Sequence, residues 1–152
     1  MPIYPQQSSA SIEVDAAPDV VWALVADITR MGEWSPECVR AEWIEGATVP
    51  AVGAKFKGHN KQGFMRWSTK PEVTAADPGK EFAFKTRDTT WRYRLESSAS
   101  GGTDVTESFE APDYGFFLNL LTPAKKREGI LVDGMQMTLA RVKAAAEGSA
   151  AG

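Results

Sequence analysis

Few residues of this chain could carry out chemistry. Its single histidine, His59, and its single cysteine, Cys38, are too few for a zinc site made of these residue types. The sequence contains no G-x-S-x-G, G-x-G-x-x-G or P-loop motif. General acid–base chemistry by Glu107, Tyr93 or Asp113 remains. Because the sequence does not give their geometry, we predict no catalytic residue, no metal ligand and no cofactor.

Two polar side chains interrupt an otherwise apolar pattern. Asn60 and Glu107 each fall in phase with the apolar residues of a predicted strand. A buried carboxyl group needs partners or a raised pKa, and a buried amide needs hydrogen bonds. A cavity that holds water or a polar ligand group would suit both residues. The alternative is that a strand end or a bulge turns them outward.

An alternating pattern in the middle of the chain predicts an antiparallel sheet. Tight turns such as Gln62-Gly63 and Asp77-Pro78-Gly79 join consecutive segments, and no helical crossover lies between them. Pro71 requires a bulge or an edge position within its strand. The seven predicted strands cover residues 9–15, 39–45, 54–61, 64–75, 81–87, 89–98 and 103–111.

Charged residues keep to one face of these strands with few exceptions, which is typical of a sheet that is wet on one side and covered on the other. His59 falls on the charged face and is expected at the surface. Cys38 is expected to be a small buried or partly buried residue. The covered face is rich in stiff aromatic side chains, namely Phe56, Trp67, Phe82, Phe84, Trp91, Tyr93 and Phe109.

Helices are predicted on either side of this sheet region. Pro18 suits the first position of a helix that ends near Asp27, and residues 29–37 form a compact turn or a second short helix. A long amphipathic helix runs from Arg127 to about Ala146. Its expected covering face is Leu131, Met135, Thr138, Val142 and Ala145. The apolar face of the long helix can cover the open apolar face of the sheet, and we expect the functional site in the space left between them.

Composition bounds the class of protein. The 152 residues predict one domain, 1–152, with frayed ends at 1–8 and 147–152. A hydrophobic fraction of 43% and a charged fraction of 24% are ordinary for a globular protein, and a net charge of −3 argues against a nucleic-acid surface. The single cysteine fits a reducing cytosol, and we find no signal peptide and no membrane span. These features predict a cytoplasmic protein.

Several segments together resemble a known superfamily. They are Ile12–Trp22, Leu24–Asp27, Trp34-Ser35-Pro36, Gly53–Asn60, Arg66-Trp67-Ser68 and Thr90–Arg94. Their order and spacing resemble the START-like superfamily, also called SRPBCC or polyketide cyclase/dehydrase and lipid transport proteins, which is related to the birch-pollen allergens. The actinobacterial members are the most similar. The resemblance covers about residues 8–145.

The resemblance implies an α+β helix-grip fold. A seven-stranded antiparallel sheet would curl around a long C-terminal helix, with two short helices between strands one and two and a deep apolar cavity. Members bind lipids, sterols, polyketides or plant hormones, and a few cyclise or dehydrate polyketides. By position, the Trp34-Ser35-Pro36 loop and the segment Tyr114–Thr122 correspond to the entrance. No catalytic residue of the family matches this chain, which disfavours an enzyme.

We therefore expect a cavity that binds or carries a hydrophobic or aromatic small molecule, lipid-like or polyketide-like. A polyketide cyclase/dehydrase-type enzyme and a protein-interaction domain with a filled cavity are the alternatives. Phe116-Phe117-Leu118 would form a lid or a dimer contact, so a monomer and a homodimer both remain open. The expected ligand-binding residues are Trp34, Phe56, Asn60, Trp67, Phe84, Trp91, Tyr93, Glu107, Phe117, Leu131 and Met135.

Overall fold

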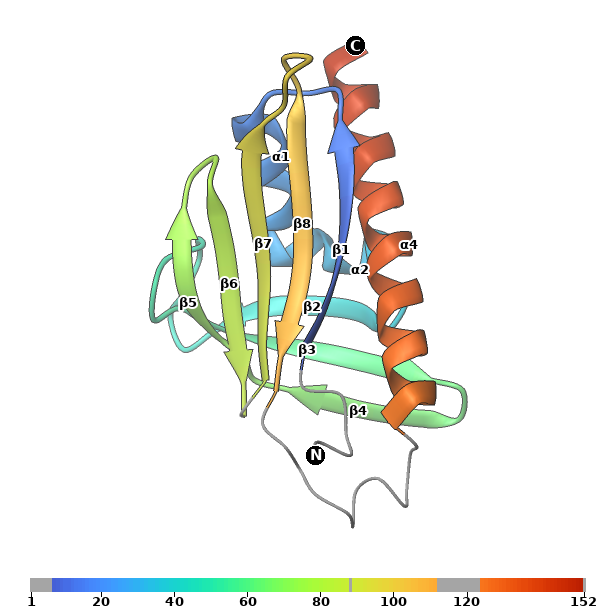
Figure 1. Ribbon diagram of the computed structural model, residues 1–152. Coiled ribbons are helices and arrows are strands. Elements are labelled where there is room, and N and C mark those ends of the chain that lie inside the picture. The colour runs from blue at the N-terminus through green and yellow to red at the C-terminus, as the bar shows by residue number, and fades with distance from the viewer. Residues whose placement is uncertain (1–6, 88, 112–123, 152) are drawn as a thin grey trace.

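A curled antiparallel sheet lies against one long C-terminal helix in the computed structural model, which describes residues 7–87, 89–111 and 124–151 (Figure 1). Three short helical segments follow the first strand. In chain order, the elements are β1 Gln7–Val14, α1 Pro18–Val25, η1 Ile28–Arg30, α2 Met31–Trp34, β2 Cys38–Ile44, β3 Lys55–Gln62, β4 Met65–Thr69, β5 Glu72–Asp77, β6 Glu81–Thr86, β7 Thr89–Ser97, β8 Thr103–Glu110 and α4 Ala124–Ala151.

The strands form one antiparallel sheet, as the turns between them predicted. Its order is β1-β8-β7-β6-β5-β3-β2, and β4 pairs with β3 beside this path. The predicted strand 64–75 is divided into β4 and β5 at Lys70 and Pro71, because proline has no N–H for the ladder. The Phe56 N–H donates to the Pro71 carbonyl at 3.1 Å, so the chain stays beside β3 at this break.

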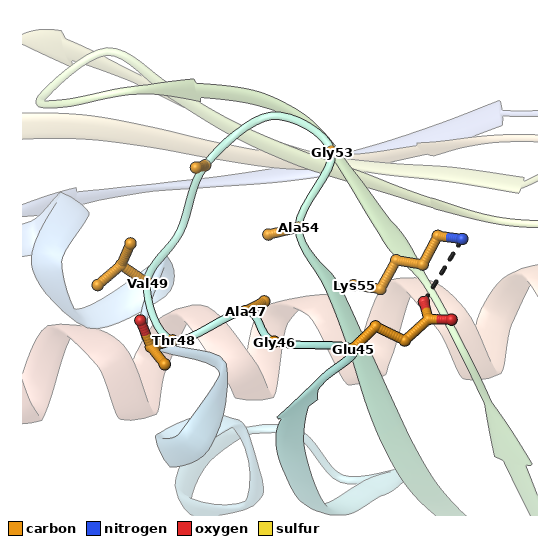
Figure 2. Close-up of a pocket in the computed structure, with 9 residues that line it drawn as sticks. Glu45, Gly46, Ala47, Thr48, Val49, Gly53, Ala54 and Lys55 are labelled. Atoms are coloured by element: carbon orange, nitrogen blue, oxygen red, sulfur yellow. Dashed lines mark ion pairs between the residues drawn. The ribbon is translucent and has the colours of Figure 1, made fainter.

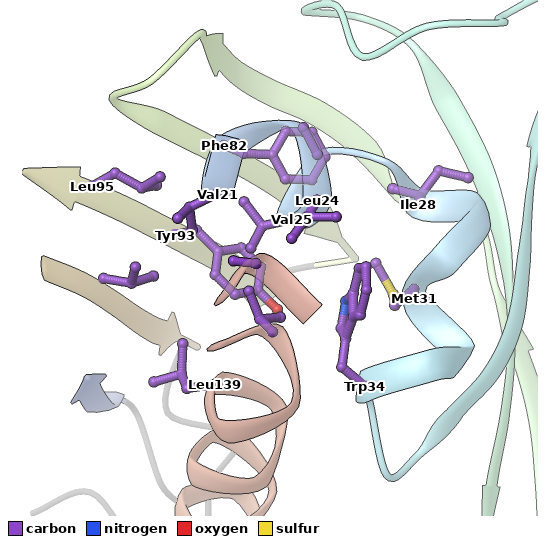
Figure 3. Packing of buried hydrophobic residues seen from close by; sticks show 14 of the residues in the cluster. Val21, Leu24, Val25, Ile28, Met31, Trp34, Phe82, Tyr93, Leu95 and Leu139 are labelled. Atoms are coloured by element: carbon purple, nitrogen blue, oxygen red, sulfur yellow. The ribbon is translucent and has the colours of Figure 1, made fainter. Parts of the chain in front are cut away.

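Helix α1 begins at Pro18, where the missing N–H costs nothing, and Asp19 lies in its positive first turn. Its apolar stripe is buried, as its spacing predicted, and consists of Val21, Leu24 and Val25, followed by Ile28 of η1. Figure 3 shows these side chains in one cluster with Phe82 and Leu95 of the sheet and Leu139 of α4. The short helices therefore cover the end of the sheet that α4 does not fill.

Helix α4 packs along β1 and β8 and also contacts α1 and α2. Its buried side chains are Met135, Thr138, Leu139, Val142 and Ala146. Leu131 and Ala145, which were expected on this face, are only half-buried. The reason is that spacings of four, three and four residues also fit Met135, Leu139, Val142 and Ala146, and the position of β1 selects that line.

Both ends of the regular structure extend further than expected. Strand β1 begins at Gln7, within the segment expected to fray, and α4 continues to Ala151. The predicted entrance segment Tyr114–Thr122, with Phe117, lies outside the described residues. Among the helices of the described ranges, none is long and apolar enough to cross a membrane.

Gly102 closes the β7–β8 turn against the end of β1, and this contact generates a stability prediction. A Cβ atom at Gly102 would lie 2.3 Å from the Val14 carbonyl oxygen, which is backbone and cannot move away cheaply. We expect Gly102→Ala to lower the free energy of unfolding by about 2 kcal/mol or more, measured by urea denaturation.

Gly129 in α4 provides the matched control, because a Cβ atom there would meet nothing within 4 Å. Gly129→Ala should be neutral or stabilising by up to about 1 kcal/mol, since alanine is the better helix former. Equal effects of the two substitutions would contradict the proposed contact.

Candidate functional site

A large hollow lies between the sheet and α4, with a volume of about 1420 Å³. Its walls come from the α2–β2 turn, from the inner faces of β3, β4, β6, β7 and β8, and from one side of α4. The curl of the sheet and the position of the long helix together produce this space, because α4 packs mainly on β1 and β8 at one side of the sheet.

Most of the residues expected at the site lie on this lining. They are Phe56, Asn60, Trp67, Phe84, Trp91, Tyr93, Glu107, Leu131 and Met135. Trp34 is not among the lining residues, although its neighbours Ser35 and Pro36 are. Phe117 lies outside the described part of the chain. The alternation of the strands therefore found much of the sheet side of the cavity.

The aromatic wall is assembled by strand register. Phe84 and Trp91 are directly opposed between β6 and β7, and Trp91 and Phe109 are opposed between β7 and β8. Directly opposed residues share one face of a sheet. The rings of Phe56 and Phe84 meet edge to face with centroids 5.2 Å apart, and those of Trp91 and Phe109 are 5.4 Å apart. This wall is stiff and apolar, as aromatic clusters are.

Trp34 has a structural position at the edge of the cavity. Only 2% of its surface is exposed, and its ring packs near Met31 (Figure 3). The Arg30 guanidinium lies 5.2 Å from the ring centroid, and Arg141 of α4 donates a hydrogen bond to the Trp34 carbonyl at 3.3 Å. Trp34 therefore holds α2 against α4 and places Ser35 and Pro36 at the lining.

Glu107 and Tyr93 form the polar centre of the cavity. They are directly opposed between β7 and β8 and are 5% exposed each. Among the described residues, Glu107 Oε1 has no hydrogen-bond partner. Burial raises the pKa of the Glu107 carboxyl from its ordinary 4.5 to about 8, although the interaction with the Tyr93 hydroxyl acts in the opposite direction. The carboxyl group is therefore mainly protonated at neutral pH.

The same environment acts on the Tyr93 hydroxyl. Burial raises its pKa well above the ordinary value, and the nearby Glu107 carboxyl raises it further. Both groups thus remain neutral in the resting cavity. A neutral carboxyl group donates one hydrogen bond and accepts others, and a phenol does the same. Together they can orient a polar group of a molecule that is otherwise apolar.

A second polar group of the lining lies between β2 and β4. Asn60 Nδ2 is 3.5 Å from Thr69 Oγ1, at the limit of a hydrogen bond. Cys38 is directly opposed to Asn60, is buried, and donates from Sγ to the Arg40 carbonyl at 3.4 Å. Burial raises the pKa of the Cys38 thiol, which therefore stays in its unreactive thiol form.

Some lining residues were not in the predicted site. Thr69 and Phe109 share the phase of the covered face, so alternation carried a signal for both. Met31, Cys38 and Thr138 also line the cavity. Nothing in the sequence near Met31 and Cys38 indicates this, because they reach the cavity through the packing of α2 and the start of β2 on β3.

The opposite face of the sheet is charged, as predicted. His59 Nε2 lies 2.9 Å from Glu42 Oε1 and 3.2 Å from Arg40 Nη2. The hydrogen bond to His59 lowers the pKa of Glu42. Arg92 pairs with Glu81 on the same face. His59 is therefore a half-buried residue of the outer face, hydrogen-bonded to Glu42, and lies outside the cavity lining.

A second hollow, of about 480 Å³, lies in the loop between β2 and β3 (Figure 2). Small residues such as Gly46, Ala47 and Ala54 line it, and the Lys55–Glu45 ion pair at 3.5 Å borders it. It has no aromatic wall and no unpaired buried polar atom. Within the described ranges, no three His, Cys, Asp or Glu residues gather as metal ligands.

An antiparallel sheet curled about a long C-terminal helix, with a lined cavity between them, defines a helix-grip protein of the START-like class. A family model described as polyketide cyclase / dehydrase and lipid transport matches residues 5–147. The chain therefore belongs to the polyketide cyclase / dehydrase and lipid transport family, as its sequence resemblance predicted.

Solved structures agree with this assignment. The Polyketide_cyc-like protein Cgl2372 from Corynebacterium glutamicum is 34% identical, with a TM-score of 0.64, over 90% of this chain and 88% of that one. Two more distant proteins share the fold. The Zhui aromatase/cyclase from Streptomyces sp. R1128 is 14% identical, with a TM-score of 0.72 over 93% of each chain. Major latex-like protein 151 from Panax ginseng is 12% identical, with a TM-score of 0.72 over 92% of this chain and 96% of that one. No curated protein matched the chain.

The buried carboxyl group predicts a specific pH dependence of stability. The folded protein binds the Glu107 proton more tightly than the unfolded chain does, so this stabilisation is complete below about pH 4.5 and is lost as the pH rises towards about 8. Between these limits the wild type should lose roughly 3–5 kcal/mol relative to Glu107→Gln, which does not titrate. Urea denaturation at a series of pH values measures the difference.

Glu110→Gln is the control, because Glu110 is an exposed carboxyl group on the same strand. Its denaturation profile should follow the wild type at every pH. Parallel profiles for the wild type and Glu107→Gln would show that Glu107 titrates normally and is not held neutral.

Proposed function

We propose that the protein binds an uncharged, hydrophobic or aromatic small molecule, lipid-like or polyketide-like, in the cavity between the sheet and α4. One observation carries this proposal. The aromatic lining surrounds a buried, protonated carboxyl group, Glu107, whose Oε1 lacks a partner within the described structure. An unsatisfied buried polar atom costs about 1–3 kcal/mol, which a ligand hydroxyl or carbonyl group would recover.

The lining supports a division of roles. Trp67, Phe84 and Trp91 would contact the apolar body of the ligand, as would Phe56 beside Phe84. Glu107 and Tyr93 would bind one polar group, and Asn60 a second one. Leu131 and Met135 of α4 would close the helix side, and methionine can adapt its shape to different ligands.

The volume of the cavity argues against the third alternative, an interaction domain with a filled core. Small-molecule pockets commonly measure about 300–1,000 Å³, and this cavity, at about 1420 Å³, exceeds that range.

The single cysteine supports a cytoplasmic location, where disulfides are rare. We further propose that the protein acts as a monomer or a homodimer, and that nucleic acid is not a partner.

Calorimetric titration with a dihydroxyanthraquinone tests ligand binding, because this probe combines a flat aromatic body with neutral hydroxyl groups. Trp67→Ala and Trp91→Ala should each weaken its binding by about tenfold or more, since each removes a large contact surface. Glu107→Leu should lower the affinity for the hydroxylated probe more than the affinity for unsubstituted anthraquinone.

Phe64→Ala is the control for the tryptophan variants, because Phe64 is fully exposed and lies outside the lining. It should bind the probe as the wild type does. Unchanged affinity in both tryptophan variants would refute the wall assignment, and an equal loss for both probes in Glu107→Leu would refute the polar role of Glu107.

A cyclase- or dehydrase-type activity is the second candidate, and the state of Glu107 favours it. A general acid or base works best when its pKa lies near the operating pH, and the pKa of Glu107 is raised to about 8. The group could therefore give and take a proton within the cavity. Turnover of a polyketide-like substrate that is lost in Glu107→Gln, with binding retained, would support catalysis. Binding without turnover in the wild type would support a carrier.

A further inference from the structure

The β3–β4 hairpin ends in two apolar side chains that face solvent. Phe64 is fully exposed and Met65 is 68% exposed. The turn itself is made by Gly63, which has a φ of +59°, so neither apolar side chain is needed to form it. An aromatic side chain that protrudes without packing partners loses the benefit of burial. The pair is therefore free to contact another surface.

The hairpin that carries this tip is strongly cationic. Residues 55–70 include five Lys or Arg residues and no Asp or Glu, although the whole chain has a net charge of −3. Lys61 and Arg66 are directly opposed between β3 and β4, and opposed like charges destabilise a sheet. Within the described ranges, no ion pair involves Lys61, Arg66 or Lys70.

This cationic tip borders the open end of the cavity. Lys61, Gly63 and Lys70 belong to the cavity lining, as does Arg87 of the β6–β7 turn. Figure 1 shows the hairpin reaching past the upright strands towards the first turns of α4. The exposed apolar tip and its cations are thus placed where a ligand would enter.

Two carboxylates also belong to the lining. Glu37 lies next to the hairpin, since its carbonyl accepts a hydrogen bond from the Lys61 N–H at 2.8 Å, and Asp133 is on α4. The cations Lys61, Arg66 and Lys70, with Arg87, outnumber them. The local charge is therefore positive on a protein whose net charge is negative.

We propose that the tip of the β3–β4 hairpin docks on the surface of an anionic lipid bilayer. Phe64 and Met65 would enter the headgroup region, where aromatic side chains are favoured. Lys61, Arg66 and Lys70 would contact the lipid phosphates. This placement would hold the open end of the cavity at the bilayer, and it does not depend on what the cavity binds, because Phe64, Met65 and Arg66 lie outside the cavity lining.

The shape of the tip favours a bilayer over an acidic protein. A stable protein interface buries about 800 Å² on each partner, whereas the apolar part of this tip is two side chains on a narrow turn. A bilayer accepts such a wedge because its headgroup region is soft, and anionic lipids add a favourable contribution for each nearby Lys or Arg.

Co-sedimentation with vesicles tests the proposal on the full-length protein. The wild type should bind vesicles that contain phosphatidylglycerol, should bind pure phosphatidylcholine vesicles weakly, and should be released by high salt. Phe64→Ser and the double variant Lys61→Gln/Arg66→Gln should each lower the partition coefficient by about tenfold or more. Phe64→Trp should bind at least as well as the wild type, because tryptophan favours the bilayer interface.

Two remote substitutions are the matched controls. Val52→Ser removes an exposed apolar side chain from the β2–β3 loop, and Lys85→Gln removes an exposed cation from β6. Both should bind vesicles like the wild type, and circular dichroism should show all variants folded.

If the wild type does not bind anionic vesicles, or if the hairpin and control variants lose binding equally, the proposal is overturned. An acidic protein that binds the hairpin while vesicles do not would overturn it as well. The anthraquinone titration is independent, so either proposal can fail without the other.

Discussion

One helix cannot cover the whole inner face of a sheet that curls around it, and the rest of the structure follows from this constraint. Helix α4 packs on β1 and β8, and the short helices α1 and α2 close the other end against residues such as Phe82 and Leu95. Between these two supports, parts of the inner faces of β3, β6 and β7 line the cavity. The aromatic side chains there form a stiff apolar wall. The architecture itself therefore produces the cavity, and no additional structural element is needed.

The cavity imposes its own conditions on polar groups. A carboxyl group at position 107 points inward because its strand alternates, and burial disfavours its charge. The protein accepts this cost, with Tyr93 beside the carboxyl group and one carboxyl oxygen unpaired within the described structure. In a filled core such a residue would only destabilise the fold. In a cavity it provides a fixed polar contact on an otherwise apolar wall, which is the arrangement that orients small molecules.

Charge follows the same division of the sheet into two faces. The outer face has compensated pairs, such as Arg40 with Glu42 and Arg92 with Glu81. The β3–β4 hairpin differs, because Lys61 and Arg66 stand side by side without a carboxylate among the described ion pairs. The uncompensated charge lies beside the open end of the cavity and next to Phe64. The cavity thus holds the neutral polar groups Glu107 and Tyr93, and the hairpin beside it carries exposed positive charge.

Local chemistry was enough to predict most of the architecture. The alternation of the strands assigned Phe56, Trp67, Phe84, Trp91 and Tyr93 to the inner face, because residues two positions apart in a regular strand share a face, and it placed Glu107 in phase with them. Proline also acted locally: Pro18 began α1, and Pro71 interrupted a strand. Asn60 and Glu107 could be recognised as unusual for the same reason, since a polar residue in phase with aromatic ones requires an explanation.

Several local arrangements fit the sequence equally well, and only the tertiary structure decided which of them the protein adopts. A helical repeat allows neighbouring stripes with similar spacing, so the choice of Leu139 and Ala146 over Ala145 depended on where β1 lies against α4. Cys38 and Met31 reach the cavity, and Trp34 holds α2 to α4, through contacts between segments far apart in the chain. The protonated state of Glu107 also depends on the tertiary structure. The strand pattern placed Glu107 in phase with the inner face but left open a bulge that turns it outward, and only the packing around it determined how little water reaches it.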